Sequence, residues 1–585
     1  MKGLEEKTQL NGATLAVAAF PVVSFALLVL ARRAGELVGL RLPMGGLLIV
    51  ASFGSGVLVL LAADPTRRLK CSLGLLLMIG YAIAAALLFR GIPDPGWDSQ
   101  TYHLPSMLRL IAGWRPLIEP TDLTLSNVYP NAGWTLLGGF SELFGFESGR
   151  AISALLMLSV ASLLWKVLRD IGMSAALAIA VTLACSANPI ALSQLFTALS
   201  DGLVWYLTAI LLLSLLIMLD DRRWIVTLTA MAALMLLINI KLSGIYFATI
   251  VTIVIVISLL CRGWPSIWAL ILERRVQIGG VAIAFALSLG FVGWRPFITN
   301  LRDYQTIIYP SPDELGYRPG SGDQVPDDLQ GKSRLQKFLS LCLARTDVAG
   351  RHNDWKVPGT ITTSELNMDS VTRVGGFGPL FGAAMIVGIA TFFSGVVIAI
   401  SCRYRPCYRA VEAPMAIFVL SLLTTILFPE PWWARFVPIA WLMPSAVAVL
   451  GFVLVREARL GRRLVGVLLG STVAVCIINS VIVGVLTVRE SLFWSGDIAN
   501  KLAGLSRDPG PLYLSEGTMW NPTIRGQHAG EDVWRRRLED LGRTDVVVVP
   551  RGDCKNGRPL SVDVMHCAST GEYPRIKGSG RVTGG

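Results

Sequence analysis

The sequence predicts an all-α polytopic membrane protein with about thirteen membrane spans and a small C-terminal α/β segment. Of its 585 residues, 53% are hydrophobic and only 16% are charged, which is far from the balance of an ordinary soluble protein. Several apolar runs approach or reach the roughly 20 residues that cross a hydrocarbon core. Each run has to be helical, because lipid cannot satisfy backbone polar groups.

Run length and apolar composition place these spans in order along the chain. The first run lacks a small-residue cleavage site and is followed by further spans, so we expect it to be a retained helix. We expect N-terminal spans in residues 1–72, a main transmembrane domain in residues 73–490 and a separate module in residues 491–585. The expected spans are residues 13–31, 46–62, 73–90, 150–168, 173–190, 200–219, 225–240, 244–261, 276–294, 376–401, 413–429, 435–456 and 463–487.

Basic residues gather in short loops between the apolar runs, where they set the orientation of the chain in the membrane. With a cytoplasmic N-terminus, nearly all of these loops fall on the cytoplasmic side, and only Arg32, Arg33 and Arg41 argue against that orientation. The formal net charge of +12 is therefore explained by topology, and we expect no nucleic-acid partner. Residues 91–150, residues 295–375 and the C-terminal tail are then expected on the outer, extracytoplasmic face.

The C-terminal tail is expected to form a small folded module outside the membrane. It holds an amphipathic helix candidate at residues 532–541 and a strand candidate at residues 545–550. Most of the nine cysteines lie in or beside apolar segments, but Cys554 and Cys567 fall in this polar tail. In an oxidising compartment, a disulfide between them would close a short loop and add about 3 kcal/mol of stability.

A cluster of polar side chains follows the third apolar run, in the stretch "GWDSQTYHLP" at residues 96–105. Asp98 is placed to cap a short helix that runs to about Trp114 and lies along the membrane surface. Its apolar side would be formed by Leu104, Met107, Leu108 and Ile111. A capping carboxylate can also face a cavity, so the two roles of Asp98 are compatible.

The same loop continues with two further acids, Glu119 and Asp122. Together with Asp98 they could hold a metal ion, or they could simply solvate a turn, and the sequence leaves both interpretations open. His103, in the same loop, is also titratable. It could contact the substrate, or it could be a structural histidine. A later outer stretch, residues 351–359, could fold over the cavity as a lid or could be a solvated loop.

Charged residues also stand at the outer ends of separate spans, where burying a charge is costly. Asp201 begins one span and Lys241 ends another at the same level. The two residues could form a structural ion pair or could belong to a functional site. Arg435 begins a third span beside Trp432 and Trp433, as an interfacial anchor or as part of the same site. A cavity lined by both signs of charge would suit an anionic substrate next to a carboxylate that accepts a proton.

These segments resemble the polyprenyl-phosphate-sugar glycosyltransferases of the GT-C class. The resemblance covers roughly residues 73–460, and it rests on the order and sidedness of five pieces. They are "WDSQTYHLP", "YPNAGW", an acid opening a later span, "WRPFITNLRDYQTIIYP" and "RFVPIAWLMP". Many members carry paired acids in the first loop, whereas Ser99 follows Asp98 here, which leaves the sugar and the acceptor undetermined.

The resemblance implies a GT-C-like helical bundle that transfers a sugar from a polyprenyl-phosphate donor to a glycan, lipid or protein acceptor, with inversion, on the outer or periplasmic face. It makes Asp98 the acid that deprotonates or positions the acceptor, and Arg435, Lys241 and Arg302 the cations that bind the substrate and stabilise its leaving phosphate. We also expect Asp201 to be catalytic, and Tyr102 and His103 to bind substrate. No cofactor is implied with certainty, and Mg²⁺ or Mn²⁺ stays open. The expected location is the inner or plasma membrane of a bacterium, in contact with membrane lipids.

Three other functions remain as alternatives. A glycan polymerase or ligase that uses a lipid-linked oligosaccharide would share the fold and the anionic leaving group. A transporter of lipid-linked glycans would need polar residues through the whole membrane depth, whereas here they gather at one end. A non-catalytic envelope scaffold would use the C-terminal tail to bind a partner protein or glycan.

Overall fold

The computed structural model describes residues 2–63, 65–309, 325–348, 350, 353–402, 408–455, 459–516, 530–549, 554, 557–561 and 564–567. Within these ranges, ten helices are long and apolar enough to cross a membrane, and three shorter apolar helices accompany them. These thirteen segments coincide with the thirteen spans expected from the sequence, with ends that differ by a few residues or more. The protein is a polytopic, helical integral membrane protein with a small C-terminal sheet.

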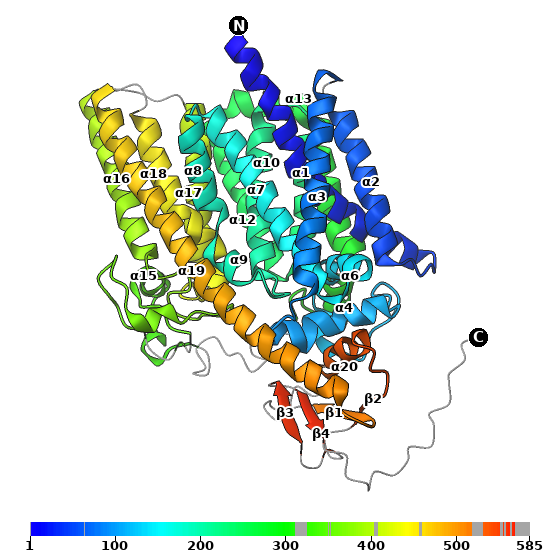
Figure 1. Cartoon of the computed structure of the whole chain (residues 1–585). Helices are drawn as coiled ribbons and strands as arrows, with labels where there is room; N and C mark the ends of the chain where they lie inside the picture. Colours follow the sequence, from blue (N-terminus) through cyan, green and yellow to red (C-terminus); the bar gives the residue numbers. More distant parts are fainter. Residues whose placement is uncertain are drawn as a thin grey trace.

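The ten long and three shorter apolar helices stand side by side in one bundle (Figure 1). They are α1 (Lys2–Leu37), α2 (Met44–Ala62), α3 (Arg68–Arg90), α7 (Ala151–Asp170), α8 (Ala175–Ser186), α10 (Asp201–Asp220), α11 (Trp224–Ile240), α12 (Ser243–Cys261), α13 (Trp264–Leu287), α16 (Phe381–Ser401), α17 (Tyr408–Leu427), α18 (Met443–Leu454) and α19 (Arg459–Arg507). Shorter helices connect them: α4 (Leu104–Ile111), α5 (Thr124–Val128), α6 (Ala132–Phe144), α9 (Pro189–Ser193), α14 (Thr299–Tyr304) and α15 (Arg334–Leu343).

The long polar segments meet at one end of the bundle. In Figure 1, α4, α6 and α15 lie at the lower end with the C-terminal sheet, and the N-terminus lies at the upper end. Two hydrogen bonds tie the segments together there: Arg537 Nη2 donates to the carbonyl of Asp94, and Asn131 Nδ2 donates to the carbonyl of Arg295. The three segments that the charge pattern assigns to one face therefore share one end of the molecule.

The segment after α3 differs from the surface helix expected from the sequence. It forms a short π-helical turn, Ser99–His103, followed by α4, which ends at Ile111 rather than near Trp114. Asp98 makes no capping hydrogen bond, because its carboxylate is turned toward Arg435 instead. Leu104 and Met107 are buried in the protein core rather than immersed in lipid.

Two of the arginines that argued against the expected orientation are not loop residues at all. Arg32 and Arg33 lie in α1 and are buried, with both side chains paired to Glu36. Arg32 also donates to the carbonyl of Trp114, and Arg33 to the side chain of Asn131. Because their charges are neutralised inside the protein, they need not be counted among the topology-setting loop charges.

The last part of the long helix α19 belongs to the C-terminal module. α19 runs without interruption from Arg459 to Arg507 and so crosses the boundary expected at residues 490–491. The module adds α20 (Gly530–Asp540) and a sheet of β1 (Leu512–Glu516), β2 (Val546–Val548), β3 (Arg558–Ser561) and β4 (Val564–Cys567). The strand order is β2-β1-β4-β3, with β1 parallel to β2 and antiparallel to β4. The helix and strand that the tail sequence indicates thus belong to one α/β unit.

A disulfide joins Cys554 to Cys567, the last residue of β4, with Cα atoms 5.3 Å apart. We expect a Cys554→Ser, Cys567→Ser double variant to lower the stability of the module by about 3 kcal/mol, because the unfolded loop loses its constraint. Faster hydrogen–deuterium exchange in β1 and β4 would measure that loss. Cys261→Ser, which removes an exposed free thiol in α12, is the control, and equal exchange in both variants would contradict the prediction.

Candidate active site

Four charged side chains meet at the end of the bundle that carries the polar segments. Arg435 bridges two carboxylates: its Nε lies 3.0 Å from Asp201 Oδ2, and its Nη2 lies 3.1 Å from Asp98 Oδ2. Lys241 Nζ is paired with the other oxygen of Asp201. Asp98, Asp201, Lys241 and Arg435 therefore form one continuous ionic network, which we call the ionic cluster.

The local fold explains how residues far apart in the sequence meet. α10 and α11 are adjacent helices joined by a short turn, so the first residue of α10, Asp201, and the residue after α11, Lys241, lie at the same level. The backbone of Lys241 is extended (φ −151°, ψ 149°), and the chain leaves the helix there. Arg435 comes from a short 3₁₀ turn, Ala434–Phe436, that precedes α18.

Gln194 completes the support of Asp201, and sequence reasoning did not identify it. Its Nε2 donates to Asp201 Oδ2 at 3.1 Å, while its Oε1 accepts from the backbone N–H of Gly202 at 2.9 Å. Both oxygens of Asp201 are thus engaged, by Lys241 on one side and by Arg435 and Gln194 on the other. The signal in the sequence was weak, since Gln194 lies in a polar stretch just before α10 with no partner that the sequence could specify.

The members of the ionic cluster differ in exposure. The side chain of Asp201 is 3% exposed, whereas those of Arg435, Asp98 and Lys241 are 12%, 17% and 21% exposed. Asp201 is therefore the interior member, and the other three face the open side. Burial disfavours the charged form of Arg435, but the carboxylates of Asp201 and Asp98 outweigh it and raise the pKa of Arg435 above its ordinary value.

Among the residues that the structure describes, only one carboxylate oxygen of Asp98 has a partner. Its Oδ2 accepts from Arg435, and among the described residues no group binds Oδ1. A partly exposed carboxylate with one oxygen fixed and the other available has the geometry of a proton acceptor or of a hydrogen-bond acceptor for a ligand hydroxyl.

Aromatic side chains line the same region. The guanidinium of Arg435 lies 5.2 Å from the ring centroid of Trp433, close enough for a cation–π interaction. Trp432 and Trp433 are buried, at 2% and 5% exposure, so their side chains face protein rather than lipid. They pack instead against the polar segment after α14, and Trp433 Nε1 donates to the carbonyl of Thr372.

Tyr102 and His103 also adjoin the ionic cluster. Their rings lie 4.2 Å apart between centroids, and Trp134 Nε1 donates to His103 Nδ1 at 2.9 Å. Burial and the charge of Asp98 raise the pKa of Tyr102. Burial lowers the pKa of His103 to about 4. Because indole is only a donor, His103 is neutral with its proton on Nε2.

Acidification should therefore destabilise the turn that holds His103. The ordinary pKa of histidine, 6.5, applies to the unfolded chain, and the folded value is about 4, so the unfolded form takes up the proton first. The contribution of His103 is complete above about pH 6.5 and is lost as the pH falls to about 4, a difference of roughly 3 kcal/mol. Thermal unfolding at pH 7 and pH 4 measures it. His103→Gln should flatten this pH dependence, and an unchanged dependence in that variant would rule the assignment out.

Other residues expected at the site lie elsewhere. Arg302 is 66% exposed and pairs with its neighbour Asp303, so its assignment to the site is not supported. Asp98, Glu119 and Asp122, expected as possible metal ligands, are not brought together: each carboxylate pairs with a different arginine, Arg435, Arg115 and Arg109 respectively. No cluster of three or more His, Cys, Asp or Glu side chains suited to a metal occurs in the described part of the chain.

The lid expected at residues 351–359 is only partly visible. Arg351 and His352 lie outside the described residues, whereas Trp355 is described and 53% exposed. The polar segment that includes them reaches the ionic cluster further on, where the carbonyl of Ser370 accepts from Gln194 at 3.5 Å. A closing motion of this segment remains a prediction.

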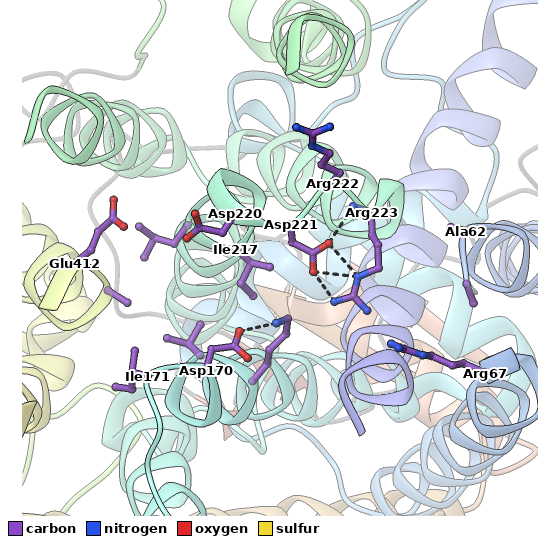
Figure 2. Close-up of a pocket in the computed structure, with 15 residues that line it drawn as sticks. Ala62, Arg67, Asp170, Ile171, Ile217, Asp220, Asp221, Arg222, Arg223 and Glu412 are labelled. Atoms are coloured by element: carbon purple, nitrogen blue, oxygen red, sulfur yellow. Dashed lines mark hydrogen bonds and ion pairs between the residues drawn. The ribbon is translucent and has the colours of Figure 1, made fainter. Parts of the chain in front are cut away.

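A large cavity, of about 800 Å³, lies at the other end of the bundle (Figure 2). α10 separates it from the ionic cluster, because Asp220 lines this cavity and Asp201 belongs to the cluster, some 30 Å apart along a 20-residue helix. Most of its charges are paired, as with Lys166 and Asp170 or Arg223 and Asp221. The cavity is therefore distinct from the ionic cluster and balances its own charges.

Comparison with known proteins gives little further guidance. No family model matches the chain, and no curated protein matches it. Among solved structures, the chain is similar to ArnT from Cupriavidus metallidurans bound to undecaprenyl phosphate, with 14% identity and a TM-score of 0.46 over 86% of this chain and 99% of that chain. It is similar to the apo state of the same protein, with 14% identity and a TM-score of 0.45 over 84% of this chain and 97% of that chain. At this level of similarity, function has to be argued from the site itself.

Proposed function

We propose that the protein is an inverting glycosyltransferase that moves a sugar from a polyprenyl-phosphate donor to an acceptor, with the ionic cluster as its active site. This proposal is carried by the arrangement of Asp98: its Oδ2 pairs with Arg435, its Oδ1 has no partner among the described residues, and Lys241 joins the same network through Asp201. The sequence resemblance to GT-C enzymes supports this function, since the segments that carry it supply these residues.

The chemistry is a single displacement at the anomeric carbon. The acceptor oxygen attacks that carbon while Asp98 Oδ1 takes up its proton, and the bond between the sugar and the phosphate oxygen breaks. The electron pair leaves with the polyprenyl phosphate. Arg435 and Lys241 stabilise the charge that develops on the phosphate, and attack from the opposite side inverts the configuration.

Asp201 has a different role in this proposal from the catalytic one expected from the sequence. It is almost fully buried, and both its oxygens already accept hydrogen bonds from cations or from Gln194. A carboxylate held in this way orients Lys241 and Arg435 rather than accepting a proton from a substrate. We therefore assign Asp201 as a positioning residue.

The proposed side of transfer is the outer or periplasmic face of a bacterial inner membrane. It is supported by the basic loops, which gather at the end of the spans opposite the ionic cluster; Arg67, Arg222 and Arg223 line the far cavity, for example. In this orientation the N-terminus is cytoplasmic and the C-terminal module extracytoplasmic. The disulfide between Cys554 and Cys567 fits an oxidising compartment.

The direct test is transfer by the purified full-length protein. Radiolabelled polyprenyl-phosphate sugars are incubated with the protein and a membrane extract, and label is expected to leave the lipid phosphate for an acceptor fraction. Addition of single sugars would support transfer of monosaccharides, whereas long glycan products from an oligosaccharide donor would indicate the polymerase or ligase alternative. Movement of labelled lipid between leaflets without a new glycosidic bond would support a transporter and refute the proposal.

Metal dependence can be tested in the same assay. Because arginines engage Asp98, Glu119 and Asp122 separately, these carboxylates do not form the ligand set expected for Mg²⁺ or Mn²⁺. We expect treatment with EDTA, or addition of either ion, to change the transfer rate by less than about twofold. Loss of activity in EDTA that Mn²⁺ restores would show that another set of ligands binds a metal.

A further inference from the structure

The C-terminal helix α20 reaches into the loop that carries Asp98. Arg537, on α20, is only 5% exposed. Its Nε lies 2.8 Å and its Nη2 2.7 Å from Glu147 Oε1. The same guanidinium donates to the carbonyl of Asp94 at 3.1 Å and to Gln100 Oε1 at 3.4 Å. One side chain from the tail thus contacts the chain both before and after Asp98.

A buried polar network extends these contacts. Glu147 Oε2 accepts from the backbone N–H of Asp94 at 3.1 Å and pairs with Arg150 at 3.3 Å. The carboxylate of Asp94 accepts from the N–H groups of Gly96 at 2.8 Å and of Ala198 at 2.7 Å. The backbone immediately before Asp98 is therefore fixed by hydrogen bonds, and Arg537 closes the network from outside.

A second contact fixes the orientation of α20. Asp532, about one and a half turns before Arg537, pairs with Arg109 of α4 at 2.9 Å. α20 thus holds the start of the segment through Arg537 and its end through Asp532. The intervening residues include Asp98, Tyr102 and His103.

We propose that α20 is a clamp that positions Asp98, with Arg537 as its positioning residue. This inference rests on the proposed function for its catalytic consequence. A buried arginine that is paired with Glu147 and also binds two groups of one short segment, the Asp94 carbonyl and Gln100 Oε1, restricts that segment more than surface ion pairs do. Since small displacements of a reacting group are costly, loosening the clamp should lower kcat, while the KM for the donor changes little because Lys241 and Arg435 are untouched.

The clamp can be tested by comparing Arg537→Gln with Arg536→Gln. Arg536 lies next to Arg537 on α20 but is 46% exposed, and within the described ranges it pairs with Asp540 alone, so it is the matched control. We expect Arg537→Gln to lower kcat roughly 10- to 100-fold with less than about threefold change in KM. Arg537→Lys keeps the charge but not the fork of donors, so its kcat should fall between those of wild type and Arg537→Gln.

Hydrogen–deuterium exchange in the full-length protein gives a readout independent of activity. Peptides covering residues 94–103 should exchange at least about tenfold faster in Arg537→Gln than in Arg536→Gln, with the exchange of α10 and α11 unchanged. If Arg537→Gln does not fold, Asp532→Asn loosens the other end of the clamp. It should also speed exchange in residues 94–103 and lower kcat, but by less.

The two proposals fail in different ways. Suppose that the wild-type protein transfers sugar. If Arg537→Gln then has the same exchange rates and the same kcat as Arg536→Gln, the clamp is refuted and the proposed function stands. A wild type without transfer activity would refute the proposed function. Faster exchange of residues 94–103 in Arg537→Gln would then still show that Arg537 holds the segment.

Discussion

Replacing Asp98 with asparagine is expected to reduce sugar transfer roughly 100- to 10,000-fold, the range typical for loss of a general base. Asparagine keeps the shape of the side chain and can still accept from Arg435, so the fold of the loop should persist. What it loses is the ability of the free oxygen, Oδ1, to take up the proton of the acceptor. The effect should appear in kcat with little change in the KM for the donor.

Asp303→Asn is the control for this variant, because Asp303 is an exposed acid at the same end of the bundle whose partner, in the part of the chain that the structure describes, is Arg302. Its transfer rate should stay within about twofold of wild type. Undiminished transfer in Asp98→Asn would show that Asp98 is not the base, whatever the outcome for the rest of the ionic cluster.

Replacing Arg435 with glutamine is expected to have two large effects. Loss of a cation that stabilises the leaving phosphate should reduce transfer roughly 100- to 1,000-fold. Loss of the bridge also leaves Asp201 with a single cation and Asp98 with none among the described residues, which should destabilise the protein by about 3–5 kcal/mol. Transfer kinetics and thermal unfolding in detergent measure the two effects separately.

Arg302→Gln is the matched control, since it removes an exposed arginine from the same end of the molecule. The double variant Arg435→Gln, Asp201→Asn removes the cation together with its most buried partner. It should be less destabilised than the sum of the two single variants, because Arg435 and Asp201 are removed together and neither is left buried without the other. Additive losses would mean that the ion pair contributes nothing to stability.

Much of the ionic cluster was predictable because its geometry follows from topology. A short turn between two spans forces the start of α10 and the end of α11 to the same level, so charges at those positions have to lie near each other. The bridging role of Arg435 was not predictable, since it depends on how a non-helical turn before α18 packs against two other segments. Gln194 was missed for the same reason.

The errors arise where tertiary contacts override local patterns. The apolar side of α4 could face lipid or protein equally well, and only the position of α6 decides between them. Glu119 and Asp122 are typical metal ligands by residue type, but Arg115 and Arg109 pair with them in the fold. Tandem tryptophans suggested an interface, but the polar segment after α14 covers them.

Because α19 is one uninterrupted helix, its length fixes where the C-terminal module lies relative to the membrane bundle. At 1.5 Å per residue its 49 residues extend about 74 Å, more than twice the roughly 30 Å of a hydrocarbon core. Ile498, Leu502 and Leu505, near its end, belong to the core of the C-terminal module, so a fragment that starts after the helix would lack part of its own interior.

Because the helix is rigid, deleting a single residue from its exposed stretch would rotate everything beyond it by about 100° and carry α20 away from the loop it contacts. A loop can bend to compensate for a deletion, but this helix would transmit the whole rotation to the C-terminal module. The distance and the angle between the lipid surface and the module are therefore set by a residue count.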